Sequence, residues 1–168
     1  MKVTGYVLRE AIAEQVLRRD TANGAFNPSL RAFPGETKDP RKVTEQLEAA
    51  ERALAQLQVA QMRYNLLVTV EVGGEKITLA EAIKRVGGTG RIEKMWKGAI
   101  GEKTRNAYMD DGDTRDPNQV RAVRTIASDE AMNLARLAGK KAAAFRAAIA
   151  TANGREVVIE DLDASLFG

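Results

Sequence analysis

A run of residues at alternating four- and three-residue spacing constrains the fold more than any other feature of the sequence. Its members are Val43, Leu47, Ala50, Leu54, Leu57, Gln61 and Tyr64. This spacing places them on one face of an α-helix and is typical of a coiled-coil seam. Asp39 and Pro40 precede the run as an N-cap and a first helical residue. The sequence therefore predicts a helix of about 25 residues, roughly 37 Å long.

A second seam near the carboxyl end predicts another long helix, from Ser128 to about Ala152. Its members are Ala131, Ala135, Ala138, Ala142, Phe145, Ile149 and Ala152. Because most of these side chains are small, the backbone of a partner helix can approach this face closely. The seam therefore favours tight pairing within the chain, between chains, or both.

An amphipathic helix is expected from Thr4 to about Ala22, with Asn23-Gly24 as its stop signal. Three of the four prolines follow within residues 23–40, which predicts a long irregular connection there.

A β-hairpin is predicted at about residues 67–77, where β-branched residues alternate around Gly73-Gly74. Thr78 and Glu81 then have the spacing of a capping box that opens a further helix. Gly87, Gly88 and Gly90 are expected to interrupt that helix, which resumes over residues 91–109.

Together these segments predict a mainly α fold, with long antiparallel helices arranged as a helical hairpin or bundle and a small β-hairpin. Three long helices and a short fourth are expected. A chain of 168 residues suffices for one domain, 1–168, with a C-terminal tail at about 155–168.

The composition excludes several kinds of chemistry, because the chain has neither cysteine nor histidine. Disulfides, thiolate metal sites, cysteine nucleophiles and histidine general bases are therefore absent. The acidic loop 110–116 lacks the spacing of a calcium-binding EF-hand, and Glu102 replaces the glycine that a phosphate loop needs before Lys-Thr. We expect no catalytic residues, no metal and no cofactor.

An anionic ligand is the small molecule that the sequence suits best. The glycines at 87–90 can expose backbone amides beside Arg91, at the start of the resumed helix. Further basic residues can converge on the same anion, although solvated faces are the alternative. The predicted ligand-binding residues are Gly88, Gly90, Arg91, Lys94, Arg121 and Arg124.

The tail ends in two large apolar residues, Leu166 and Phe167, after three acids. It is similar to the short peptides with which partners dock on DNA sliding clamps, and to encapsulin cargo-loading peptides. The alternative is that Leu166 and Phe167 pack on the chain itself or on a neighbouring subunit. Leaving them in water would forgo about 1.5–3 kcal/mol for each side chain.

The amino-terminal residues 1–6 lack the apolar core of a signal peptide, and no apolar run approaches the ~20 residues that span a bilayer. A cytoplasmic protein without membrane partners is therefore expected. The net charge of +3 does not by itself predict nucleic-acid binding.

The order of these segments over about residues 5–152 resembles the septicolysin-like family of small bacterial helical proteins. The resemblance rests on an opening Leu-Arg-Glu-Ala-Ile helix, Asp39-Pro40, the heptad helix ending at Arg63-Tyr64-Asn65, the Gly-Gly hairpin and residues 77–83. It implies the helical fold and no activity, because the family's function is uncharacterised.

Two long seams exceed what one small hairpin buries, so self-association is expected. The leading hypothesis is a non-enzymatic interaction or assembly protein that works as a homo-oligomer. The alternative is an oligomeric binding protein for an anionic small molecule such as a nucleotide, and an enzyme without histidine or cysteine chemistry is the third possibility.

Overall fold

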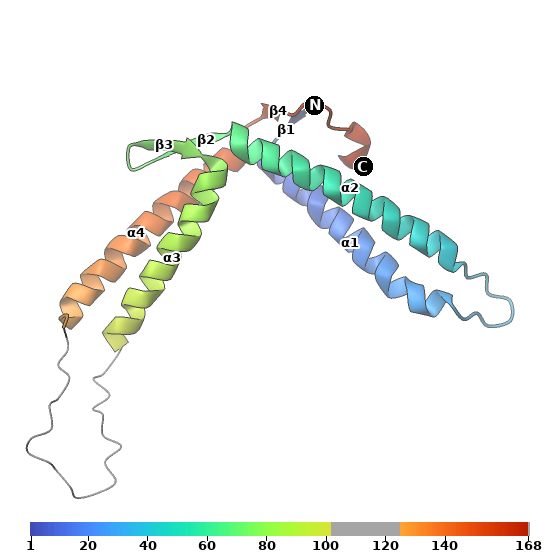
Figure 1. The fold of residues 1–168 in the computed structure, drawn as a ribbon, viewed down its shortest axis with the longest axis horizontal. Helices are drawn as coiled ribbons and strands as arrows, with labels where there is room; N and C mark the ends of the chain where they lie inside the picture. Colours follow the sequence, from blue (N-terminus) through green and yellow to red (C-terminus); the bar gives the residue numbers. More distant parts are fainter. Residues whose placement is uncertain (102–124, 168) are drawn as a thin grey trace, which may run out of the picture. The chain divides into compact units, whose positions relative to one another are not determined.

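The computed structural model describes residues 1–101 and 125–167 (Figure 1). The mainly α fold with a small β-hairpin is confirmed. The chain divides into two compact units. The first unit combines Met1–Glu81 with Ala148–Gly168, and the second comprises Ala82–Ala147.

Helix α1 (Gly5–Ser29) begins as the sequence predicts, because the Thr4 hydroxyl accepts a hydrogen bond from the Val7 amide at 3.2 Å. The predicted stop at Asn23-Gly24 is wrong, since the helix continues to Ser29 and includes Pro28. Ala22 and Ser29 are buried on the side of α1 that packs against α2. This packing offsets the weak helix propensity of Asn23 and Gly24.

Helix α2 (Pro40–Leu67) is the long helix that the heptad spacing predicts, and the Asp39 carboxylate caps it through the Arg41 amide at 3.0 Å. No member of the predicted seam is exposed. Ala50, Leu54, Leu57 and Tyr64 are buried, and Val43, Leu47 and Gln61 are half-buried. Because α1 is longer than expected, the connection to α2 is shorter, covering residues 30–39.

The predicted hairpin is confirmed as β2 (Thr69–Val72) and β3 (Glu75–Thr78), with Val70 paired to Ile77. Gly73 and Gly74 both have positive φ, 64° and 83°, as a two-residue turn of this type requires. Thr78 then caps α3 by accepting a hydrogen bond from the Glu81 amide at 3.1 Å.

A second strand pair closes the first unit. Strand β1 (Lys2–Val3) lies antiparallel to β4 (Val157–Val158), as Figure 1 shows near the amino terminus. A short 3-10 helix, η1 (Ala164–Phe167), ends the described tail. The buried side chains of this unit include Leu8, Leu57, Leu79 and Ile159.

Helices α3 (Leu79–Gly101) and α4 (Ser128–Asn153) supply the described part of the second unit. The predicted interruption at residues 87–90 is wrong, because α3 is continuous through its glycines. The described ranges 1–101 and 125–167 thus contain four long helices, where three and a short one were predicted. In α4 the predicted seam is buried at every position except the half-buried Ile149. Gly139 of α4 lies against Glu93 of α3, where an added Cβ would come within 3.1 Å of the carboxylate. The two helices therefore pack closely here, as small residues permit.

Within residues 1–101 and 125–167, no helix has the length and apolar character needed to cross a membrane.

Candidate functional site

The candidate site of the first unit begins at Tyr64, a fully buried residue of α2. Its hydroxyl oxygen lies 2.7 Å from the carbonyl oxygen of Ala152 and 2.8 Å from that of Arg155. Burial raises the pKa of Tyr64 above its ordinary value, so the phenol stays protonated as a donor. The tyrosine thereby fixes the point at which the C-terminal tail leaves α4.

Gly5, the first residue of α1, packs against the same point. A Cβ added there would lie 2.4 Å from the Asn153 side-chain oxygen and 2.9 Å from the Tyr64 ring. Only glycine leaves room for this approach, which brings the start of α1 against the end of α4. No motif around Gly5 indicates this role.

The first part of the tail is fixed by backbone hydrogen bonds. The Ile159 amide donates to the Met1 carbonyl, and the Met1 ammonium donates to the Ile159 carbonyl, both at 2.9 Å. The Arg155 guanidinium donates to the carbonyl of Thr69 at 2.7 Å, which ties the tail to the β2–β3 hairpin. These contacts direct the following residues along α2.

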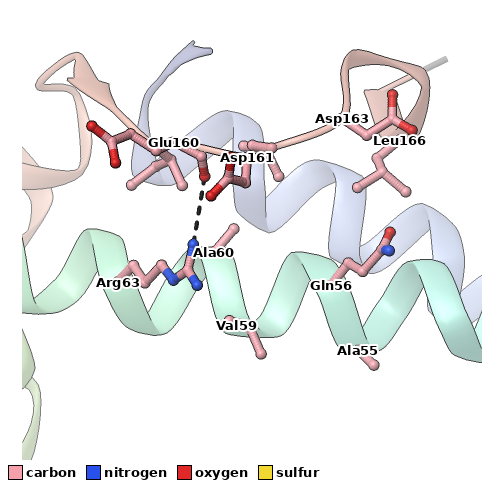
Figure 2. A pocket seen from close by; sticks show the side chains of 11 residues that line it. Ala55, Gln56, Val59, Ala60, Arg63, Glu160, Asp161, Asp163 and Leu166 are labelled. Carbon is pink, nitrogen blue, oxygen red and sulfur yellow. Dashed lines mark hydrogen bonds between the residues drawn. The ribbon is translucent and has the colours of Figure 1, made fainter.

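Between the tail and α2 lies a groove of about 330 Å³, shown in Figure 2. Gln56, Ala60 and Arg63 point from α2 toward the tail, and the Arg63 guanidinium donates to the carbonyl of Glu160 at 3.5 Å. The opposite wall carries the carboxylates of Asp161 and Asp163. The groove therefore combines one cation with a mainly acidic rim.

Asp163 organises the end of the tail. Its carboxylate accepts a hydrogen bond from the Ser165 amide at 2.9 Å, and this bond lowers the pKa of Asp163. The turn that results places Leu166 in the wall of the groove. Leu166 and Phe167, the predicted interaction residues, are both half-buried. Docking of this pair on a sliding clamp or an encapsulin shell stays a prediction.

A second groove, of about 670 Å³, adjoins the first at Leu166 and lies between α1 and α2. Its lining is rich in alanine and includes Ala22, Ala25, Ala49, Ala50 and Ala53. Arg18 and Thr21 contribute polar groups from α1. The tail thus borders the groove without filling it.

A second apolar stripe runs along the face of α2 opposite the buried seam. It consists of Ala55, Val59, Met62 and Leu66, at spacings of four, three and four residues. All four are exposed, with Met62 at 64% and Leu66 at 63% of their maximum. Figure 2 shows Ala55 and Val59 pointing away from the tail. This stripe was not predicted, although the same heptad count, started at Ala55, identifies it in the sequence.

The predicted anion site lies in the second unit. Gly88, Gly90, Arg91 and Lys94 all belong to α3, and both basic side chains are exposed. The helix start on which the prediction relied is not there, because α3 begins at Leu79 and runs through the glycines. Their amides are therefore those of a helix interior, not of a free N-terminal turn. Arg121 and Arg124 lie outside the described residues.

In the part of the chain that the structure describes, no three acidic side chains gather as a metal site would require. No protein-family model matches the sequence, and no curated protein or solved structure is significantly similar to it.

Proposed function

We propose that this protein is a non-enzymatic interaction protein that assembles with copies of itself through the exposed stripe of α2. One observation supports this above all: a single helix carries two apolar heptad stripes, on opposite faces, and its own unit covers only one of them. Helices with such a pattern pair with a further helix when one is available.

The stripe has a defined length, which limits how long the apolar surface of a partner helix can be. The next positions toward the amino end at the same spacing are Arg52, Glu48 and Glu45, all exposed and charged. The apolar contact thus covers the C-terminal part of α2, from Ala55 to Leu66. A second copy offers a stripe of the same length and chemistry.

Side-chain sizes favour an antiparallel pair of α2 helices. A two-fold axis between Val59 and Met62 sets Ala55 of one copy opposite Leu66 of the other, so small residues meet large ones along the contact. On the flanks, Arg63 then faces Gln56, and Gln58 faces Asn65, so no like charges are opposed. A parallel pair would place Leu66 against Leu66 and Ala55 against Ala55, so the distance between the two helices would have to vary along the contact.

The expected affinity is modest. Full burial of a side chain such as Val59, Met62 or Leu66 contributes about 1.5–3 kcal/mol, and between half and two thirds of each is still exposed. The gain from six such side chains in a dimer is therefore comparable with association costs of about 4–15 kcal/mol and exceeds them by a few kcal/mol at most. We expect a dissociation constant in the high-micromolar to millimolar range.

Sedimentation equilibrium tests the proposal. Met62→Glu places a charge in the centre of the stripe and should shift the protein to monomers. The matched control is Leu137→Glu, which alters a similarly exposed apolar residue of α4, 59% exposed against 64% for Met62. A monomeric parent protein, or dissociation by the control and not by Met62→Glu, would contradict the proposal.

Cysteine cross-linking tests the orientation, because the chain has no cysteine of its own. Ala55→Cys mixed with Leu66→Cys should form a disulfide between copies under mild oxidation. Neither variant alone should do so, because equivalent positions would lie roughly 16 Å apart along the helix and a disulfide needs Cα atoms within about 7 Å. A disulfide of Leu66→Cys with itself would instead indicate a parallel pair.

A further inference from the structure

Charge is divided unequally between the two units. The second unit contains 14 basic and 8 acidic residues, a net charge of +6, whereas the first has 12 and 15, a net charge of −3. Within the described ranges 82–101 and 125–147 the imbalance is stronger, with nine basic residues against three acidic ones. The mild total charge of the chain hides this division.

Helix α4 carries much of the imbalance. No aspartate or glutamate occurs from Ala131 through Gly154, a stretch that contains Arg136, Lys140, Lys141 and Arg146. All four basic side chains are exposed. The acids that begin the helix, Asp129 and Glu130, lie in its first turn, where they complement the helix dipole.

The one other acid among the described residues of this unit is already engaged. Glu93 of α3 pairs with Lys97 at 2.7 Å and has an exposed fraction of 19%. Lys97 and, more weakly, Arg146 of α4 lower the pKa of Glu93, so its negative charge is compensated mainly within α3. The positive charge of α4 therefore stays largely unneutralised.

The face of α4 opposite its alanine seam carries basic residues, with mostly short side chains between them. Its exposed residues at helical spacing are Asn133, Arg136, Lys140, Ala143 and Ala147. Alanine leaves the backbone accessible between the long basic side chains. A polyanion can therefore approach the helix backbone closely, while Arg136 and Lys140 reach its negative charges.

We infer that this face of α4 binds the phosphate backbone of a nucleic acid, without reading its sequence. The major groove of a duplex is about 12 Å wide and admits a helix, whose basic side chains then reach the phosphates on either side. A membrane surface fits less well, because helices that lie on bilayers insert a row of large apolar side chains, whereas α4 exposes only Met132 and Leu137, one on each side of this face. The inference goes beyond self-association and does not depend on it.

Fluorescence anisotropy with a labelled mixed-sequence DNA duplex tests the inference. The full-length protein should bind with an affinity that falls steeply as salt rises. Arg136→Glu with Lys140→Glu should weaken binding at least about tenfold at low salt, and should reduce the slope of log affinity against log salt by about 2, one for each lost phosphate contact.

The matched control is Arg41→Glu with Lys42→Glu, which reverses two exposed charges in the first turn of α2 in the first unit. This variant should bind within about twofold of the parent if α4 makes the contact. Equal loss in both variants would overturn the inference, as would absence of duplex binding. Binding to vesicles containing phosphatidylserine, with none to the duplex, would replace it with a membrane surface. Circular dichroism verifies that each variant keeps its helices.

Discussion

The two units bury different kinds of side chain. The core of the first unit includes five large residues that are almost fully covered: Leu8, Leu57, Tyr64, Leu79 and Ile159. In the described part of the second unit the buried residues are five alanines, Thr89 and a single large one, Phe145. The first unit is therefore stabilised by buried apolar area and by the contacts of its tail, and the second by small side chains packed between two helices.

The sole tryptophan makes this difference measurable. Trp96 lies in α3 within the second unit, so its fluorescence reports on that unit, whereas circular dichroism follows all the helices. Each of the following substitutions alters one unit only. Comparing Trp96 fluorescence with circular dichroism then distinguishes unfolding of that unit from unfolding of the whole chain.

The largest effect is expected from Tyr64→Ala. Loss of this buried ring should lower the free energy of unfolding of the first unit by about 3–5 kcal/mol. Tyr64→Phe keeps the ring and removes only the donor to the two carbonyls, so it should cost about 1–3 kcal/mol. Urea denaturation followed by circular dichroism measures both losses. If the urea midpoint followed by Trp96 fluorescence shifts as far as the midpoint followed by circular dichroism, the two units unfold together. Their different cores would then not make them separately stable.

Gly5→Ala should have the next largest effect. The added methyl would overlap Asn153 and the Tyr64 ring, and relieving this overlap should cost about 1–3 kcal/mol. The same substitution at Gly24, where a Cβ would meet nothing within 4 Å, is the control and should not destabilise. Thermal denaturation compares the two variants. Equal melting temperatures would show that the start of α1 does not need glycine.

In the second unit, replacement of a glycine should act in the opposite direction. Gly88 lies inside α3 with open space around its missing Cβ. Gly88→Ala should therefore stabilise α3 by about 0.5–1 kcal/mol, because alanine loses less backbone freedom in a helix. The Trp96 transition in urea measures the gain. A loss of stability would mean that this face of α3 packs closely against another surface.

The smallest effect concerns the Glu93–Lys97 pair. Because Lys97 lowers the pKa of Glu93 in the folded protein, the pair contributes stability above the ordinary carboxyl pKa, and this contribution is lost as pH falls through the lowered value. Lys97→Ala should raise the pKa of Glu93 toward its ordinary value of 4.5. Nuclear magnetic resonance titration of the Glu93 carboxyl group detects the change, and an unaltered pKa would assign the lowering to another neighbour.

Periodic and capping signals in the sequence predicted the fold well. The seams of α2 and α4, the caps at Thr4 and Asp39 and the Gly73-Gly74 turn all occur as expected. Each depends on residues that are close in the sequence, so local geometry alone determines it. The seams also identified the buried faces, because helical spacing fixes which side chains share a side.

The errors arose where distant contacts outweigh local preference. Asn23-Gly24 and the glycines of α3 are helix stops by propensity, at a cost of about 1 kcal/mol for each glycine, which tertiary packing readily offsets. The β1–β4 pair could not be predicted, since each strand has two residues and its partner lies over 150 positions away. A heptad count finds the stripe of α2, but only the packing of the first unit shows that the stripe is left uncovered, and the exposure of the basic face of α4 likewise depends on packing.

The division of the first unit into two chain segments has a consequence during synthesis. Residues 1–81 leave the ribosome first, and α1 and α2 can pair as soon as both are made. Tyr64 must wait for the carbonyls of Ala152 and Arg155, and Val3 for its partner Val157. At about 5–20 residues per second, that delay is roughly 5–20 seconds. During this delay, the face of α2 that the tail later covers is open to chaperones and to other nascent chains. The unit is complete only when β4 pairs with β1, and not when α1 and α2 first pair.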